Sequence, residues 1–179
     1  MTAPSGNKNF SRMSPLNDAY ETCERTCAKL QLYCGDIHPS VVTERLSLNP
    51  THQVVLGEES PPNSLGLKRV GKVNGWFLSS EEHVKSKDVR HHLDWLLAKL
   101  EPNAEALREL QSRPGVRTSI NCPWWSQYGD GGPTLWPEQM QALANLNLEL
   151  SFEFAYYGPE EFTESAPSNA PQDSSSTNK

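Results

Sequence analysis

The sequence predicts an α+β fold in which a single mixed, mainly antiparallel five-stranded sheet carries helices on one face. Several short segments alternate apolar with polar residues, which is the period of a half-buried strand, and 148–156 does so almost throughout. Helical spacing of leucines separates these segments and is clearest over 88–110. Because most alternating segments are apolar on one side only, we expect an open face opposite the helices.

The expected elements follow the order β-α-β-β-α-β-α-β, and 179 residues provide one core of ordinary size. The five strands are expected at 28–34, 53–56, 72–78, 116–122 and 148–156. The first six elements match the ferredoxin-like pattern, to which the last helix and strand add an α-β unit. Right-handed crossovers then set the first strand beside the third and make the fourth antiparallel to the first.

Three helices are expected. The first begins at Pro39 and the last at Pro137, because the fixed φ of proline suits the first helical position. The longest follows Asp88, whose carboxylate suits an N-cap, and it buries a stripe of leucines. Pro102 bends or interrupts this helix, and Asn103 can cap a continuation.

Trp95 lies on the side of the long helix opposite its leucine stripe, with His91 four residues before it and Lys99 four residues after it. One interpretation is that the indole packs against a neighbouring helix or the N-terminal arm. The other is that Trp95 anchors a binding partner, with His91 beside it.

The two ends of the chain lack any periodic pattern of apolar residues. We expect a flexible N-terminal arm over 1–18, a single domain over 19–157 and a disordered polar, acidic tail over 158–179. The tail consists largely of Ser, Pro, Asn and Glu, which offer too little apolar surface to offset the entropy lost on ordering.

A formal net charge of −6 without a basic stripe argues against nucleic acid as a partner. The outward side of the expected sheet mixes charges around Tyr33, which suits solvent or a protein interface better than stacked bases.

No apolar run approaches the roughly 20 residues of a membrane span, and the N-terminus lacks a signal-peptide segment, so the expected location is the cytoplasm. Cys23, Cys27, Cys34 and Cys122 follow no metal or disulfide spacing and are expected to be reduced.

No reaction-specific motif occurs, and we expect no catalytic residue, metal or cofactor. His91 and His92 diverge by about 100° on a helix, so they cannot hold one metal ion together. The G-D-G-G at 129–132 lacks both the Lys-Ser/Thr of a phosphate loop and the G-x-G-x-x-G spacing, and is better interpreted as a turn. The sequence does not define the oligomeric state.

The best candidate for a binding site is the glycine-rich loop 123–133. Its candidate residues are Trp124, Trp125, Tyr128 and Asp130. So short a segment cannot bury three aromatic side chains, so at least one should lie in a cleft or at the surface. One interpretation is a hydrophobic plug closing one end of the sheet. The other is a site for a partner protein or a flat ligand, joined by Trp76.

Five stretches carry a family resemblance. They are G-D (35–36), L-S-L-N-P (46–50), G-W-F-L (75–78), D-V-R-H-H-L-D-W-L-L-A-K-L-E-P (88–102) and L-N-L-E-L-S-F-E-F-A-Y-Y (146–157). With these the chain resembles the uncharacterised bacterial family DUF4279, a domain of unknown function, over about 28–157. The resemblance implies a small bacterial α+β domain without assigned activity or cofactor, and it suggests a toxin-neutralising (immunity) setting.

We therefore expect a non-enzymatic protein-interaction module whose partner is another protein, such as a toxin or the product of a neighbouring gene. The alternative is a small-molecule sensor or enzyme with a pocket at the loop 124–133. A flat exposed aromatic patch would favour the first function, and a closed apolar pocket the second.

Overall fold

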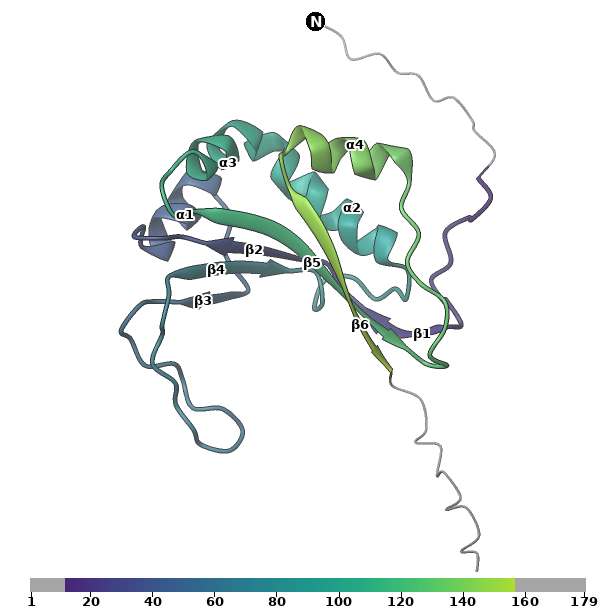
Figure 1. Cartoon of the computed structure of the whole chain (residues 1–179), viewed down its shortest axis with the longest axis horizontal. Helices are drawn as coiled ribbons and strands as arrows, with labels where there is room; N and C mark the ends of the chain where they lie inside the picture. The colour runs from purple at the N-terminus through teal and green to yellow at the C-terminus, as the bar shows by residue number, and fades with distance from the viewer. Residues whose placement is uncertain (1–11, 157–179) are drawn as a thin grey trace, which may run out of the picture.

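Within residues 12–156, a curved sheet of six strands runs through the molecule, and four α-helices lie on one side of it (Figure 1). The computed structural model describes residues 12–156. The strands are β1 (Cys23–Thr26), β2 (Lys29–Tyr33), β3 (His52–Val54), β4 (Gly75–Ser79), β5 (Arg117–Ser126) and β6 (Glu149–Tyr156). The helices are α1 (Pro39–Leu46), α2 (Val89–Leu100), α3 (Ala104–Gln111) and α4 (Pro137–Asn145). The predicted α+β class is therefore confirmed.

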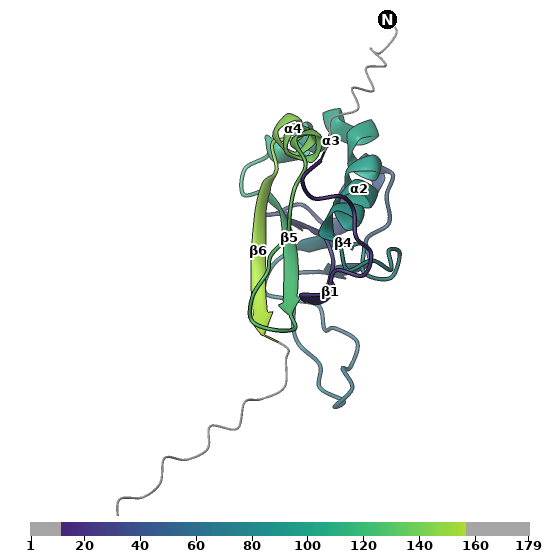
Figure 2. The same cartoon turned by 90° about the vertical axis from the view of Figure 1, so that its right-hand side faces the viewer.

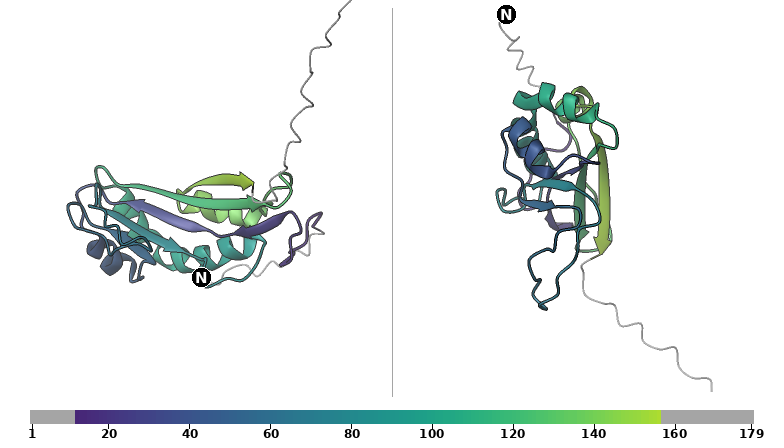
Figure 3. Two further views of the ribbon diagram at one scale, coloured as in Figure 1. Left: turned by 90° about the horizontal axis from the view of Figure 1, so that it is seen from below. Right: turned by 90° about the vertical axis from the view of Figure 1, so that its left-hand side faces the viewer.

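The sheet is mainly antiparallel. β2 lies between β4 and β5 and is antiparallel to both, and β3 extends the sheet beyond β4. One side of β5 pairs first with β2 and then with β1, while its other side pairs in parallel with β6. The opposite side of the sheet carries no helix from residues 12–156, and Figure 3 (left) looks onto this open face.

The sixth strand, β1, corrects the predicted count of five. β5 does not end at Cys122 but continues to Ser126, through residues predicted as loop, and β1 pairs with that extension. Pro123, which has no N–H to donate, stands opposite the interruption between β1 and β2, and its carbonyl accepts a hydrogen bond from Thr26 Oγ1 at 2.8 Å. Cys23–Thr26 is a strand because it pairs with the extension of β5, so its own pattern of residues did not reveal it.

The start and the interruption of the long helix agree with the sequence. The Asp88 side chain accepts a hydrogen bond from the backbone N–H of Arg90 at 3.1 Å, which makes Asp88 the N-cap of α2. Pro102 lies in a 3₁₀ turn, Glu101–Asn103, between α2 and α3. Asn103 precedes α3, but its side chain instead donates to the Lys99 carbonyl at 3.0 Å, so the predicted side-chain cap does not form.

The core fills the space between the sheet and the helices. Its strand residues include Leu30, Leu32, Trp76, Leu78 and Ile120, and its helix residues include Val42, Leu46, Leu93, Leu96 and Leu107. The predicted leucine stripe of α2 is therefore buried. None of the helices in residues 12–156 is long and apolar enough to cross a membrane.

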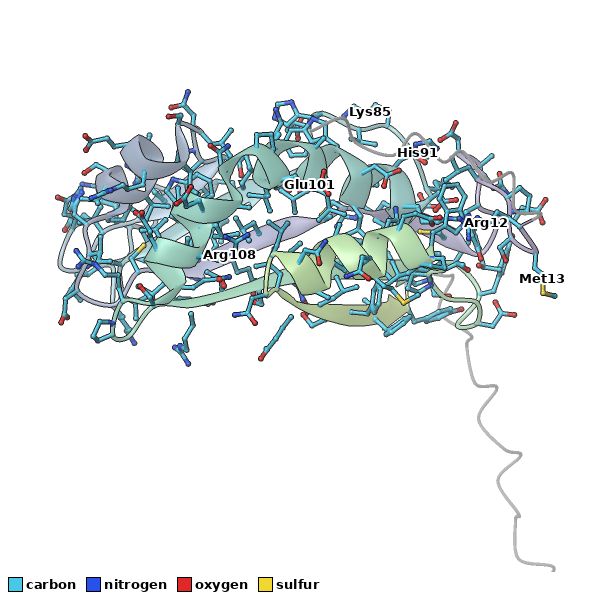
Figure 4. The ribbon with its side chains drawn as sticks, turned by 90° about the horizontal axis from the view of Figure 1, so that it is seen from above. Arg12, Met13, Lys85, His91, Glu101 and Arg108 are labelled. Carbon is cyan, nitrogen blue, oxygen red and sulfur yellow. The ribbon has the colours of Figure 1, made fainter. Side chains whose placement is uncertain are left out.

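The described part of the predicted arm, 12–18, packs on the helix layer. Residues 1–11 lie outside the described part of the chain, but Arg12 forms an ion pair with Glu138 at 2.6 Å, at the N-terminal end of α4 (Figure 4). The buried guanidinium of Arg90 donates to the carbonyls of Ser14 and Pro15 at 2.6 and 2.8 Å. A buried guanidinium needs several acceptors, and the arm supplies two of them. The predicted tail, 158–179, lies outside the described residues.

The end of β6 also departs from expectation. Phe154 and Tyr156 are predicted to face inward with Leu150 and Phe152, yet they are 60% and 54% exposed. They do lie on the helix side of the strand, but β6 runs away from α4 along its length (Figures 1 and 2). Alternation therefore predicted the shared face correctly and the burial of the last two side chains wrongly.

Candidate functional site

Two of the candidate tryptophans belong to the core. Trp76 is fully buried, and its indole N–H donates to Thr43 Oγ1 at 3.0 Å. Trp124 is 1% exposed and meets the ring of Tyr20 edge-on, with the ring centroids 5.3 Å apart. These two indoles fill space between layers, which agrees with the plug interpretation of the loop and leaves no indole surface for a partner at either position.

The other candidates from the loop reach the surface, but they point in different directions. Trp125 lies on the open face, where the Arg25 guanidinium covers its ring at 4.0 Å from the centroid. Tyr128 is 64% exposed at the tip of the loop. Asp130 is exposed as well, and its backbone carbonyl accepts a hydrogen bond from Ser126 Oγ at 2.8 Å. The expectation that at least one aromatic of the loop reaches the surface is met by Tyr128.

Trp95 and His91 lie on the helix layer, apart from the open face. Trp95 is half-buried between two neighbours: the His83 ring stacks on it at 4.7 Å, and Lys99 Nζ lies 4.7 Å from the ring centroid. His91 Nε2 lies 3.3 Å from Asp18 Oδ1 of the arm. The seven candidate residues therefore do not converge on one site, and a role in binding remains a prediction for the five other than the buried Trp76 and Trp124.

A different aromatic group forms on the open face, centred on Phe77 of β4. Its neighbours in sequence, Trp76 and Leu78, point into the core, so the ring of Phe77 points away from it. A Cβ at Gly75 would lie only 2.7 Å from atoms of this ring. The ring thus lies over the bare backbone of Gly75, and the glycine is what makes this position possible.

Three side chains from other strands complete this group. Tyr33 of β2 meets Phe77 edge-on at 5.8 Å between centroids, and His52 of β3 stacks on it at 5.8 Å. The Arg117 guanidinium of β5 lies 5.6 Å from the Tyr33 ring centroid. We call Tyr33, His52, Phe77 and Arg117 the open-face cluster.

A shallow hollow of about 490 Å³ lies against the open-face cluster. It is lined by Lys29, Gln31, Thr51, His52, Val54, Phe77, Ser79, Glu81 and Glu82. The lining mixes one cation and two carboxylates around an aromatic centre. This composition is typical of the anchor and rim of a protein interface.

Beside the cluster, the chain between β3 and β4 projects from the sheet on the side away from the helices (Figures 1 and 2). We call this segment, 55–73, the finger. Backbone hydrogen bonds cross it at Gly57–Gly71, Ser60–Arg69 and Asn63–Leu67, with N···O distances of 2.8–2.9 Å. The Asn63 side chain also accepts from the backbone N–H groups of Leu65 and Leu67 at its tip, which fixes the turn there.

The finger exposes apolar side chains along its whole length. They are Leu56, Leu65, Leu67, Val70 and Val73, of which Leu65 is 79% exposed. Lys68 and Arg69 accompany them, and Lys68 forms an ion pair with Glu59 at 2.9 Å. A hydrogen-bonded loop that holds several leucines and valines in solvent is typical of a surface that binds another molecule.

One close Ser-His pair, Ser80 and His92, is buried in the core. Ser80 Oγ lies 2.8 Å from His92 Nδ1, but the hydroxyl also accepts from the Ala28 N–H, and His92 Nε2 lies 2.8 Å from the Ser86 carbonyl. This Ser-His pair is saturated within the core, and burial lowers the pKa of His92. It holds the loop after β4 against α2.

The cysteine thiols are free and buried in the described structure. Burial raises the pKa of Cys23 and Cys34 to about 11, and it raises the pKa of Cys27 and Cys122 as well. A thiol with a raised pKa is a poor nucleophile at neutral pH. Residues 12–156 also contain no group of three or more His, Cys, Asp or Glu side chains placed to hold a metal ion.

The fold and the open-face cluster together define a small α+β domain with one sheet face that no helix of residues 12–156 covers. A family model, "Domain of unknown function (DUF4279)", matches residues 22–157, and the chain belongs to this family. The comparisons with curated proteins and with solved structures found no match.

Sequence reasoning missed the open-face cluster and the finger. A signal for Phe77 was present, because it alternates with Trp76 and Leu78 two residues after a glycine. His52 gave no signal, since its stacking depends on the register between β3 and β4. Most of the finger, 57–71, lies between two predicted strands, but composition could not show that this segment is hydrogen-bonded.

Proposed function

We propose that the protein is a non-enzymatic protein-interaction module that binds its partner with the finger and the open-face cluster. The observation that carries the proposal is the finger, whose ladder of hydrogen bonds holds exposed leucines and valines in a fixed arrangement. Preorganised apolar side chains lose little conformational entropy on binding. The open-face cluster adds an aromatic anchor with charged neighbours on the same side of the molecule.

The narrower form of the proposal is that the partner is a toxin, which the protein neutralises by covering part of its surface. The net charge of −6 supports it, because an acidic protein associates faster with a basic target. The free, buried thiols support a reducing compartment, the cytoplasm, as the place of action.

The test is photo-crosslinking in the native host. A photoreactive amino acid at Leu65, in the finger, should give a specific adduct, while the same group at Arg108, on the exposed helix side (Figure 4), should not. The partner identified in this way is then tested in a pull-down with the unmodified chain. Replacing both Leu65 and Leu67 with Ser should abolish its capture in that pull-down without lowering the melting temperature, because both side chains are exposed. Capture that survives this double change, or equal adducts from Leu65 and Arg108, would contradict the proposal.

A second candidate function is the binding of a flat small molecule, which the hollow over Phe77 favours. A thermal-shift screen of metabolites distinguishes the two functions. A small-molecule site predicts a stabilising ligand whose effect is lost in Phe77→Ala and kept in the double Leu65→Ser, Leu67→Ser variant.

We also propose that the fold is a ferredoxin-like core with an added α-β unit. The placement of β2 between β4 and β5, with α1 after β2 and α2–α3 before β5, supports this description. The added unit is then α4 with β6, and it builds the edge of the sheet next to β5.

A further inference from the structure

β6 forms one edge of the sheet, and within residues 12–156 its two glutamates are the main feature that could protect this edge from pairing. Within residues 12–156 it pairs with β5 alone, over eight residues in unbroken register. Its sequence, E-L-S-F-E-F-A-Y, contains no proline or lysine, and its ladder contains no bulge. From Glu149 to Ala155, such an edge presents unpaired backbone donors and acceptors to another strand.

Apolar side chains gather along this edge on its helix side. Phe154 is 60% exposed and lies 6.3 Å from the ring of Phe152, which is only partly buried. Met140 of α4 is half exposed, and Ala144, one turn further on, borders the same groove as the start of β6. An exposed strip of this kind beside an open backbone edge is typical of a surface that another strand covers.

The positions of the two glutamates select how a second copy of β6 could pair. Glu149 and Glu153 both project on the open-face side. A register is therefore disfavoured when it sets Glu149 of one copy opposite Glu153 of the other, or the two copies of Glu153 opposite each other. An antiparallel pair centred on Phe152 avoids both cases. It sets Glu149 opposite Ala155 and Glu153 opposite Ser151, and it uses nearly the full length of the strand.

On the helix side the same register places apolar residues opposite one another. Leu150 faces Phe154 of the partner subunit, and Phe152 faces its own copy. The other edge strands are shorter, because β1 has four residues and β3 has three, and β3 leads directly into the finger. Pairing of β6 with β6 therefore closes on itself, as two-fold dimers do.

We infer that this edge is a homodimerisation site, where two chains join antiparallel β6 strands around Phe152 into one continuous sheet. This dimer goes beyond the proposed partner binding and is independent of it, because it uses neither the finger nor the open-face cluster.

Sedimentation equilibrium of the full chain tests the inference. We expect a monomer–dimer equilibrium whose larger species has twice the 20.0 kDa mass of one chain. Ala155→Glu sets like charges opposite each other twice per dimer and should raise the dimer Kd by roughly 2- to 30-fold. Ala155→Lys sets a lysine opposite Glu149 of the partner subunit and should lower the dimer Kd by a similar factor.

The matched controls are Gln53→Glu and Gln53→Lys, which make the same charge changes on exposed β3 at the far edge and should leave the dimer Kd unchanged. A chain that stays monomeric from micromolar to submillimolar concentration overturns the inference. A dimer also overturns the inference if its Kd is unchanged in both Ala155 variants, or if its Kd changes in the Gln53 variants. None of these results bears on photo-crosslinking at Leu65, so failure of the dimer and failure of the proposed function are distinguishable.

Discussion

The buried ion pair between Arg90 and Asp88 offers the sharpest test of the energetics of the fold. Both side chains are almost completely buried, and the guanidinium lies 2.8 Å (Nε) and 2.5 Å (Nη2) from the two carboxylate oxygens. Arg90→Met removes these bonds and the two to the arm, and leaves the Asp88 carboxylate with backbone N–H donors alone. Breaking one side of a buried pair costs about 3–5 kcal/mol, so we expect that loss in the free energy of unfolding.

Urea unfolding followed by tryptophan fluorescence measures this free energy. The matched control is Arg45→Met, because the Arg45–Glu109 pair is exposed on both sides, and its loss should cost about 0–1 kcal/mol. The double variant Asp88→Ser, Arg90→Met keeps a capping hydroxyl and removes both charges, so it should be more stable than Arg90→Met alone. If Arg90→Met lowers the free energy of unfolding no more than Arg45→Met does, the Arg90–Asp88 pair does not hold the arm and α2 together.

The same pair sets a pH dependence. Burial by itself would raise the pKa of Asp88, but the hydrogen bonds from Arg90 and from the Asn17 backbone lower it below 3.8. The stabilisation is therefore complete above the ordinary pKa of an aspartate and is lost as pH falls through the lower folded value. Acid unfolding should show this loss in the wild type, and the double Asp88→Ser, Arg90→Met variant should lack it.

Three further predictions follow from buried groups. Because the pKa of His92 is lowered, the free energy of unfolding should fall as pH decreases below 6.5, and His92→Gln should flatten that slope in urea titrations at several pH values. Gly75→Ala should cost roughly 1–3 kcal/mol, because its Cβ meets the Phe77 ring at 2.7 Å, and should cost less in a Phe77→Ala background. Ellman's reagent should react slowly with the native thiols and rapidly after denaturation, and fast native labelling of Cys122 would contradict its burial.

Local signals explain why parts of the fold were predictable. Asp88 caps α2 and Pro102 interrupts the helix because capping and the missing N–H of proline act within one turn. Strand β1 was not predictable, because Cys23–Thr26 becomes a strand only where β5 continues past Pro123. The exposure of Phe154 and Tyr156 at the end of β6 could not be predicted either, because alternation shows which face of a strand a residue lies on but not how far a helix covers that face.

The candidate site shows the same division between local and long-range information. An excess of tryptophan pointed to the loop 123–133, yet Trp124 turns inward because β5 continues through it and every second side chain of a strand faces the core. The open-face cluster instead joins residues from four strands, and its contacts depend on register. Composition along the chain carries no direct information about such a register.

The two proposed surfaces have a joint consequence. An antiparallel β6 pair with its two-fold axis perpendicular to the sheet extends one sheet across both subunits, so both open faces and both fingers point to the same side. A partner that presents two copies of its binding surface would then engage both subunits, and its second contact would form at high effective concentration. Ala155→Glu should therefore weaken binding of a two-copy partner more than binding of a single copy. The double Leu65→Ser, Leu67→Ser variant should weaken both, since it removes the contact itself. If Ala155→Glu weakens binding of the two-copy partner and of the single-copy partner equally, the two fingers bind independently of each other.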